Sequence, residues 1–423
     1  MNCKIEKSRL YGRIVCPSNK SYTHRAIMIG ALADKTSLIK NILQSKDTRA
    51  TIDACKSFGA QIKETGNELT IEGIKEFKNK DIEINAENSG TTIRIAAAIA
   101  SLSGAKTVLT GDESLRKRPM QPLLDALKTL GAKCSSTDGN PPITISGIIK
   151  GGEINIPGNI SSQFISALLI VAPKTENGIT LSIEGDLVSK PYLDATINVM
   201  NKFGINVNTI TPYKKYQIPS QNYRSTTLTI PTDYSSLALL LSASVLLGDN
   251  LTFEITSEEL PQGDEKIIDI LQNLGVSVTL NKNSISVKSP EKLKGGKFDL
   301  KNTPDLLPPL AVLSLKTSHP IEIVNVKHAR YKETDRIAVL SRELQKLGVK
   351  VQEKEDGMIL ESTEKFHGAE LNSENDHRLF MALCIAGMFV GDCKVSNPES
   401  IGISYPNFIL DMNKVGGKIK SNL

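Results

Sequence analysis

The chain has 423 residues, roughly two to three times the length of a typical domain, which predicts two domains or one large repeat. The 51 basic and 46 acidic residues give a formal charge of +5, and 4% aromatic residues with no Trp argue against stacking platforms for single-stranded nucleic acid. Six scattered cysteines without a C-x-x-C pair predict reduced thiols in a cytoplasmic protein, and five histidines without an H-E-x-x-H pattern give no support for a metal or another cofactor. The N-terminal stretch lacks the apolar core of a signal peptide, and the longest apolar stretch, at 237–247, is far shorter than the ~20 residues that span a bilayer.

Amphipathic helices that end in glycine recur along the chain, about 72 residues apart. In 120–131, for example, apolar residues at steps of three and four positions predict a helix, and the final glycine is a typical C-cap. Two short alternating strands around a turn follow each helix, as in 276–288. The glycines that mark this series are Gly59, Gly131, Gly204, Gly275, Gly348 and Gly416, and the last copy is truncated.

A second series of helices runs out of phase with the first and is apolar nearly all round, so we expect these helices to be buried. Each follows a small or polar loop, and the loops are marked by Lys20, Gly90, Ser162, Ser235, Asp305 and Asp376. The two series predict six units, each with one buried helix, one amphipathic helix and several strands, arranged as two halves of three. The polar stretch 222–229 is the candidate boundary. A solenoid is the alternative, although solenoid repeats usually have 20–45 residues.

The loops before the buried helices carry the residues best suited to chemistry. The N-terminus of a helix binds anions through its unpaired N–H groups, although Ser, Thr and Asn there are also ordinary N-caps. Basic residues at such positions oppose the helix dipole, so their recurrence in matching phases favours an anion site over a solvated basic face. These residues are Lys20, Arg25, Arg94, Arg116, Lys117, Arg118, Lys332, Arg336 and Arg378. Asp305 and Glu333 are candidates for acid–base catalysis, with an N-cap and a surface ion pair as their respective alternatives.

Eight segments, in this order, carry a resemblance to a known family. They are PSNKSYTHRA (17–26), NSGTTIR (88–94), RKRPMQPLLDAL (116–127), SSQFISALL (161–169), SKPYLDAT (189–196), PDLLPPLAVLS (304–314), YKETDRI (331–337) and NDHRLFMA (375–382). From about Arg13 to Phe408 the chain resembles the 5-enolpyruvylshikimate-3-phosphate synthase family, also called 3-phosphoshikimate 1-carboxyvinyltransferases. The resemblance implies an α/β fold of two similar domains, each with three βαβαββ units around buried helices, the inside-out barrel of enolpyruvyl transferases. It implies an N-terminal domain at 14–228, a C-terminal domain of 1–13 plus 229–423, and an active site in the interdomain cleft.

The resemblance also implies roles for individual residues. The catalytic residues would be Asp305 as proton acceptor, Glu333 and Lys20, with Lys332 as a partner of Asp305. Shikimate-3-phosphate would be held by Lys20, Ser21, Arg25, Ser161, Ser162, Gln163, Ser189, Asp305 and Lys332, with Tyr192 packed nearby. Phosphoenolpyruvate would be held by Lys20, Gly90, Arg118, Gln163, Arg336 and Arg378. Two positions depart from the family pattern: Ile403 stands where a lysine is usual, and His328 where an asparagine is common. Either Ile403 packs under its loop and Lys414 or Lys418 replaces the missing cation, or the other basic residues carry its charge.

The reaction implied is the transfer of the enolpyruvyl group of phosphoenolpyruvate to the 5-hydroxyl of shikimate-3-phosphate, with release of phosphate through a tetrahedral intermediate. It belongs to the shikimate pathway to chorismate and the aromatic amino acids, and needs no metal or redox group. The expected partners are these small molecules, with no nucleic acid or membrane, and the expected state is a monomer in the cytoplasm. One alternative is the sister transferase that acts on UDP-N-acetylglucosamine, which typically has a cysteine in the loop that here reads DESLRKRP (112–119). The other is a non-catalytic anion-binding repeat protein, in which Asp305 and Glu333 would be dispensable.

Overall fold

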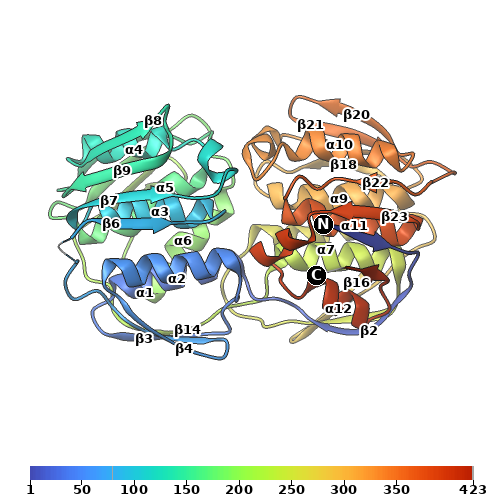
Figure 1. The fold of residues 1–423 in the computed structure, drawn as a ribbon, viewed down its shortest axis with the longest axis horizontal. Coiled ribbons are helices and arrows are strands. Elements are labelled where there is room, and N and C mark those ends of the chain that lie inside the picture. The colour runs from blue at the N-terminus through green and yellow to red at the C-terminus, as the bar shows by residue number, and fades with distance from the viewer. Residues whose placement is uncertain (79, 422–423) are drawn as a thin grey trace. The chain divides into compact units, whose positions relative to one another are not determined.

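The chain, described at residues 1–78 and 80–421 in a computed structural model, divides into two compact units (Figure 1). The N-terminal unit consists of Ser18–Pro231 and Glu258–Pro261. The C-terminal unit consists of Met1–Pro17, Thr232–Ser257 and the chain from Gln262 onward. Each unit has a hydrophobic core built from its own residues.

Within the described residues, the strands form six four-stranded sheets, three in each unit. The first sheet of the N-terminal unit has the order β14 (Thr227–Thr229), β3 (Thr36–Lys40), β5 (Glu68–Glu72) and β4 (Gln61–Thr65). The second has the order β6 (Ile82–Asn85), β7 (Gly104–Thr110), β9 (Asn140–Gly147) and β8 (Lys133–Thr137). The third has the order β10 (Gly152–Pro157), β11 (Ile179–Glu184), β13 (Lys215–Ile218) and β12 (Asn208–Thr211).

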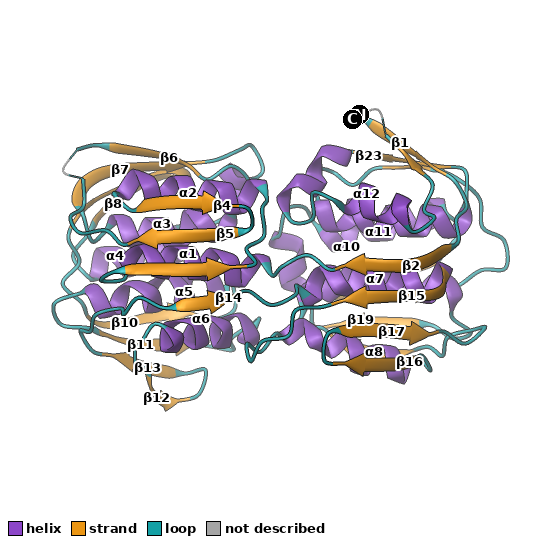
Figure 2. Cartoon of the chain, turned by 90° about the horizontal axis from the view of Figure 1, so that it is seen from below, coloured by secondary structure: helices purple, strands orange, loops and turns teal. Residues whose placement is uncertain are grey.

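The sheets of the C-terminal unit follow the same plan. The first has the order β2 (Leu10–Val15), β15 (Gly248–Glu254), β17 (Ser284–Lys288) and β16 (Ser277–Asn281), which Figure 2 shows in that succession. The second has the order β18 (Gly296–Asp299), β19 (Ile321–Val324), β21 (Gly357–Glu361) and β20 (Lys350–Lys354). The third has the order β22 (Glu370–Leu371), β23 (Cys393–Ser396), β1 (Asn2–Ile5) and β24 (Ile419–Lys420).

Each sheet joins one parallel pair of strands to an antiparallel hairpin or its equivalent. In the second sheet, β6 runs parallel to β7, β7 pairs antiparallel with β9, and β8 closes the hairpin with β9. Parallel neighbours require a crossover, and in four sheets a buried helix supplies it, as the helix at Gly90–Ala100 does between β6 and β7. Three sheets are completed by a strand from a distant part of the chain. β14 pairs with β3, β2 pairs with β15, and β1 lies between β23 and β24.

The six buried helices that the sequence predicts are present. In the N-terminal unit they are α1 (Lys20–Leu32), α3 (Gly90–Ala100) and α5 (Ser162–Val171), and in the C-terminal unit α7 (Tyr234–Leu247), α9 (Leu307–Leu313) and α11 (His377–Val390). They pack on one another inside their unit, α3 between α1 and α5, and α7, α9 and α11 in mutual contact. The strands lie outside them, as Figure 1 shows for α3 behind β6 and β7.

Six amphipathic helices also match the prediction. They are α2 (Lys46–Phe58), α4 (Gln121–Thr129), α6 (Lys190–Lys202), α8 (Ile267–Asn273), α10 (Arg336–Lys346) and α12 (Phe408–Lys414). All six marker glycines follow these helices with φ between 78° and 122°, a backbone conformation that residues with a Cβ rarely adopt. Short 3-10 helices lie at Leu115–Lys117 (η1), Ala172–Lys174 (η2), Gly263–Lys266 (η3), Pro304–Leu306 (η4), Ser314–Lys316 (η5), Lys327–Tyr331 (η6) and Pro398–Ile403 (η7). The predicted α/β fold class, with two similar domains of three units each, is confirmed.

Candidate functional site

The N-terminus of α1 carries two of the predicted cations. Asn19 caps the helix, and its side chain accepts a hydrogen bond from the backbone N–H of Tyr22. Lys20 is the first helical residue, and its Nζ lies 3.0 Å from Oδ2 of Asp47. The side chain of Lys20 is 15% exposed and that of Asp47 is 5% exposed. The ammonium group is therefore held in a fixed place by a carboxylate that the sequence analysis had not singled out.

Arg25 lies one turn further along α1 and is buried with neutral partners. Its Nε donates to Oγ1 of Thr196 at 2.8 Å, and its two terminal nitrogens donate to the backbone oxygens of Ser21 and Tyr192, each at 3.0 Å. Burial lowers the pKa of Arg25 to about 10, because the charged form loses its hydration. A buried guanidinium whose acceptors are uncharged is well suited to an anionic ligand.

Two further guanidinium groups lie at the start of α3. A Cβ built on Gly90 would lie 3.1 Å from Nη1 of Arg94, 3.3 Å from Nη1 of Arg118 and 3.5 Å from Oε1 of Gln163. Arg94 donates to the Gln163 oxygen, and the Gln163 amide donates to Oγ1 of Thr91 at 3.1 Å. The structure thus brings together Gly90, Arg118 and Gln163, which the resemblance groups as a binding site, and adds Arg94 to them.

Arg118 is held from behind by hydrogen bonds to neutral oxygens. Its Nη1 donates to the backbone oxygen of Asn88 at 3.2 Å, and its Nη2 donates to the Asn88 side-chain oxygen at 2.9 Å and to Oγ of Ser114 at 3.1 Å. Only 8% of Arg118 is exposed. The contacts fix the plane of the guanidinium while its charge stays unneutralised by these partners.

The serines of the predicted phosphate site lie at two neighbouring helix starts. Ser161 caps α5, and its side chain accepts a hydrogen bond from the backbone N–H of Gln163 at 3.3 Å. Ser162 is the first residue of α5 and is buried. Ser189 precedes α6 in a left-handed conformation with φ of 57°, and α5 packs against α6. Left-handed backbone at a non-glycine residue is uncommon and concentrates at functional positions.

The C-terminal unit gathers acids around one buried arginine. Arg336, at the start of α10, is 1% exposed. Its guanidinium donates to Asp376 at 2.7 and 3.3 Å, to Oδ1 of Asp305 at 2.7 Å and to Oε2 of Glu333 at 2.7 Å. Burial alone lowers the pKa of Arg336, but the charges of the three carboxylates outweigh it and raise the pKa above its usual value.

Asp305 is the point where the predicted catalytic residues meet. It lies in η4, before α9, and it is 9% exposed. Besides Arg336, its carboxylate lies 3.7 Å from Nζ of Lys332 and 3.4 Å from Nη2 of Arg378. The structure brings together Asp305, Lys332, Glu333, Arg336 and Arg378. Such a carboxylate can accept a proton from a substrate hydroxyl, and the cations around it can hold an anion.

The sequence comparisons agree with the chemistry of the basic residues in the N-terminal unit and of the acids around Arg336 in the C-terminal unit. The family model described as EPSP synthase (3-phosphoshikimate 1-carboxyvinyltransferase) matches residues 5–412. A Nitrosopumilus maritimus protein named 3-phosphoshikimate 1-carboxyvinyltransferase is 63% identical over 420 residues, which cover 99% of this chain and 100% of the relative. A Methanosarcina acetivorans protein of the same name is 44% identical and covers 99% of both chains. This chain belongs to the EPSP synthase family.

Solved structures show the same fold. EPSP synthase from Acinetobacter baumannii covers 100% of both chains with a TM-score of 0.83 and 25% identity. The enolpyruvyl transferase NikO from Streptomyces tendae has a TM-score of 0.77 at 18% identity, covers 99% of this chain and 98% of the other, and shares the fold alone. Both agree with the two-domain enolpyruvyl transferase architecture.

Three acids that interact with predicted site residues were not assigned a role from the sequence. Asp376 was used only as a marker of its loop, yet it caps α11 and accepts from the backbone N–H groups of Arg378 and Leu379. Its placement before a buried helix is the signal that could have identified it. Asp47 lies in the first turn of α2 and Asp264 in η3, and only the tertiary fold brings their charges to Lys20 and Asp305 respectively.

The two departures from the EPSP synthase pattern have different surroundings. Ile403 lies at the end of η7 and is buried, which agrees with packing under its loop. His328 is half-buried, and its pKa is lowered to about 4 by burial and by the charge of Lys332, so its imidazole is neutral at pH 7. Lys414 is exposed and lies 3.4 Å from Asp411.

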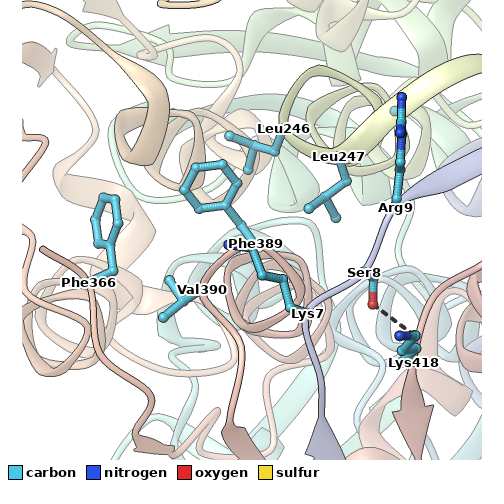
Figure 3. Close-up of a pocket in the computed structure, with 10 residues that line it drawn as sticks. Lys7, Ser8, Arg9, Leu246, Leu247, Phe366, Phe389, Val390 and Lys418 are labelled. Atoms are coloured by element: carbon cyan, nitrogen blue, oxygen red, sulfur yellow. Dashed lines mark hydrogen bonds between the residues drawn. The ribbon is translucent and has the colours of Figure 1, made fainter. Parts of the chain in front are cut away.

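Lys418 belongs to a different part of the C-terminal unit. It lines a cavity of about 900 Å³ together with Lys7, Ser8, Arg9, Leu246, Leu247, Gly248, Phe366, Phe389 and Val390 (Figure 3). This cavity lies at the C-terminal ends of α7 and α11, whereas Asp376 and Arg378 lie at the N-terminal end of α11. A 14-residue helix is about 21 Å long. Lys418 is thus a poor substitute for the missing lysine.

The described residues, 1–78 and 80–421, contain neither a metal-type side-chain cluster nor a membrane-crossing helix. Among them no cluster of three or more His, Cys, Asp or Glu side chains is arranged to hold a metal ion. Within the same ranges no helix combines the length and the apolar character needed to cross a membrane.

Proposed function

We propose that this chain is a 3-phosphoshikimate 1-carboxyvinyltransferase, which transfers the enolpyruvyl group of phosphoenolpyruvate to the 5-hydroxyl of shikimate-3-phosphate and releases phosphate. Membership of the EPSP synthase family supports this activity. The observation that carries it is the Asp305 carboxylate with Lys332, Arg336 and Arg378 within 3.7 Å of it. This arrangement joins a base to the cations that a polyanionic substrate pair requires. Relatives in the comparisons bear the same name, so the UDP-sugar alternative is set aside.

Residues of both units are proposed to act on the same pair of substrates. Shikimate-3-phosphate is assigned to Lys20, Ser21, Arg25, Ser161, Ser162, Gln163, Ser189, Asp305 and Lys332. Phosphoenolpyruvate is assigned to Lys20, Gly90, Arg118, Gln163, Arg336 and Arg378. The neutral hydrogen-bond acceptors of Arg25 and Arg118 support these assignments, because they position each guanidinium before the ligand arrives and leave its charge for the ligand.

The proposed mechanism is an addition followed by an elimination. The 5-hydroxyl adds to C2 of phosphoenolpyruvate while C3 takes a proton, which gives a tetrahedral ketal. Loss of phosphate and of a C3 proton then gives the enolpyruvyl ether. Asp305 and Glu333 are assigned the proton transfers, and Lys20 assists at the bridging oxygen as it leaves. Arg336 joins both acids to one rigid helix start, which fixes the distance between them.

The test is phosphate release from phosphoenolpyruvate with and without shikimate-3-phosphate, in the presence of a chelator. We expect release that depends on shikimate-3-phosphate and is not supported by UDP-N-acetylglucosamine. Release with the nucleotide sugar alone would contradict the assigned substrate. Absence of release with either acceptor, from a protein that binds phosphate ligands, would favour the non-catalytic alternative.

The chain is further proposed to work as a monomer in the cytoplasm, without nucleic acid or membrane partners. The six free cysteines, five of them buried, are typical of a reducing compartment. Light scattering coupled to size exclusion should give 46.0 kDa for a monomer. A mass of twice that value at micromolar concentration would contradict the monomer.

A further inference from the structure

Asp264 is a buried carboxyl group that the proposed mechanism does not use. It lies in η3, and only 4% of the residue is exposed. Ser235, in the first turn of α7, donates its hydroxyl hydrogen bond to Oδ2 of Asp264. The other oxygen, Oδ1, is buried and accepts no hydrogen bond from the described residues. A buried carboxylate with one donor is costly to keep ionised.

The surroundings of Asp264 connect it to the proposed active site. Both η3 and η4 pack against α7, and α11 packs there too. The charges of Asp305 on η4, Arg378 on α11 and Asp233, which caps α7, all act on the Asp264 carboxyl. The Asp264 carboxyl therefore interacts electrostatically with the proposed base and with one of the cations assigned to phosphoenolpyruvate.

The net charge around the proposed base Asp305 depends on whether Asp264 is ionised. Arg336, Lys332 and Arg378 carry three positive charges, which match the carboxylates Asp305, Glu333 and Asp376. With Asp264 protonated these six groups remain neutral as a set. With Asp264 ionised the set gains a negative charge, beside the buried carboxylate of Asp233. A ligand with a carboxylate and a phosphate is then repelled more strongly.

The surroundings of Asp264 favour a change of its protonation state close to neutral pH. Burial, and next the negative charge of Asp305, raise the pKa of Asp264 to about 7, while the Ser235 hydrogen bond and Arg378 act in the opposite direction. Near pH 7 the ionised and protonated forms are therefore both present before ligand binds.

We propose that Asp264 is a positioning residue that takes up a proton when phosphoenolpyruvate binds, which leaves the charge of Arg378 available to the substrate. This inference rests on the proposed function, because it assumes that phosphoenolpyruvate lies against Arg378. An incoming anion favours the protonated form of Asp264, and by linkage the protonated form binds the anion more tightly. Asp264 acts through Arg378 and does not touch the substrate.

Proton uptake on binding tests the inference directly. The enzyme is saturated with shikimate-3-phosphate and titrated with phospholactate, which keeps the carboxylate and phosphate of phosphoenolpyruvate but lacks the reactive double bond. Isothermal titration calorimetry in buffers of different ionisation enthalpy gives the number of protons taken up. For the unaltered enzyme we expect a maximum of uptake between pH 7 and 8, and little uptake from Asp264 at pH 5.5, where it is already protonated.

Two variants are expected to change proton uptake in different ways. Asp264→Asn keeps the size of the side chain and an acceptor for Ser235, and should abolish this component of proton uptake. Its affinity for phospholactate should fall less between pH 7 and 8.5 than that of the unaltered enzyme. Ser235→Ala removes the hydrogen bond that favours the ionised form, so the uptake maximum should move to higher pH. Protons exchanged by phospholactate itself are common to all variants and cancel in the comparison.

A matched control separates this role from a structural one. Ser242→Ala removes another buried hydroxyl from the same helix, one that donates to the backbone oxygens of Ala238 and Pro309. It should leave the pH of maximal uptake unchanged. A merely structural Asp264 would alter stability or kcat in Asp264→Asn without altering proton uptake.

The inference is overturned if folded Asp264→Asn takes up as many protons as the unaltered enzyme across pH 6–8.5. If Asp264→Asn does not fold, an unshifted uptake maximum in Ser235→Ala overturns it equally. Failure of the proposed function is distinguishable, because it would appear as absent phosphate release in the unaltered enzyme.

Discussion

Two buried arginines show how the surroundings of a side chain set what it can bind. Arg25 donates to neutral oxygens, whereas Arg336 is surrounded by three carboxylates. An anion that approaches Arg25 is attracted by a positive charge that its neutral partners do not cancel. An anion that approaches Arg336 must compete with the three carboxylates that already bind this residue. We therefore expect Arg25 to contribute mainly to affinity and Arg336 mainly to the positions of Asp305 and Glu333.

Replacing Arg25 tests the first half of this contrast. Arg25→Met fills the same buried position with an apolar side chain but loses the charge, so shikimate-3-phosphate should bind at least tenfold more weakly. A hydrogen bond to a charged group contributes about 1.5–3 kcal/mol. The measurement is calorimetric titration, with the melting temperature of the free variant as a control for folding. Unchanged affinity in a folded variant would contradict the assignment of Arg25.

The acids are tested by isosteric amides. Asp305→Asn and Glu333→Gln should each lower kcat by about 10²–10⁴-fold, because general acid–base groups contribute that much. Calorimetry should show that shikimate-3-phosphate still binds. Glu322→Gln is the matched control, since Glu322 is an ion-paired acid of the same unit on β19 and should leave kcat unchanged. A normal kcat in either active-site variant would remove that residue from the proton transfers.

At the scale of elements, the start of each buried helix is where sequence and chemistry meet. The loops before α1, α3 and α5 place their polar residues at helix N-termini. The cap residues Asn19 and Ser89 each accept a hydrogen bond from one backbone N–H of the first helical turn. Gly90 is distinctive because its backbone angles are ordinary and only the space around it requires glycine. The absence of a side chain lets the guanidinium groups of Arg94 and Arg118 approach α3.

Gly90→Ala follows from this close approach. The new Cβ would lie 3.1 and 3.3 Å from the terminal nitrogens of Arg94 and Arg118, so both groups must move by a few tenths of an ångström. We expect the KM for phosphoenolpyruvate to rise about tenfold, as for the loss of ~1.4 kcal/mol, with little change in shikimate-3-phosphate affinity. The melting temperature should not fall, because alanine favours helix more than glycine does. Steady-state kinetics with each substrate varied in turn would check this, and equal changes in both would contradict it.

The repeated elements were predictable because each depends on local residues. The six glycines and the six apolar helix segments mark the units by themselves, and the structure has a helix at every one. The completion of three sheets by β1, β2 and β14 was not encoded in any local pattern, because each of these strands pairs with a segment far away in the chain.

The candidate site was predictable only in part, namely for the residues that lie in the repeated loops. Loops in matching phase pointed to Lys20, Arg25 and Asp305, and resemblance supplied their roles. Their partners could not be found in this way, because Asp47 and Asp264 reach them only through tertiary packing. A carboxylate in the first turn of an amphipathic helix, or in a short 3-10 helix, carries no sequence signal of the residue that it will contact.

At the scale of the whole molecule, buried ionisable groups connect stability to pH. Burial and the neighbouring Asp305 raise the pKa of Asp264 from 3.8 to about 7, so the folded protein binds more protons than the unfolded chain between those values. Stability from this group is greatest at low pH and is lost as pH rises toward 7, by at most about 1.4 kcal/mol per pH unit.

Asp264→Asn should therefore become more stable relative to the unaltered protein as pH rises from 5 to 8. Denaturant unfolding of both proteins at several pH values gives the difference, in which the other titrating groups cancel. A difference that stays constant with pH would contradict the raised pKa of Asp264. A difference that moves in the opposite direction would contradict it more strongly.

The division of the core into two separate clusters predicts that the N-terminal unit folds by itself. All residues of its core belong to Ser18–Pro231 except Leu260, which comes from the short segment Glu258–Pro261 and is 3% exposed. Loss of that side chain costs about 1.5–3 kcal/mol of burial. The loss is small beside a core of this size, because the fragment keeps all strands of its three sheets, including β14.

We therefore expect the fragment of residues 18–231 to unfold cooperatively, followed by circular dichroism because the chain lacks Trp. Inorganic phosphate should raise its melting temperature, since Arg25, Arg118 and the start of α5 are all present, and the same fragment with Arg25→Met should show a smaller rise. In the full chain, Leu260→Ala should lower the melting temperature of the N-terminal unit without removing phosphate binding. A fragment that melts without a cooperative transition would show that this unit depends on the rest of the chain, and that two separate cores do not suffice for two independent folding units.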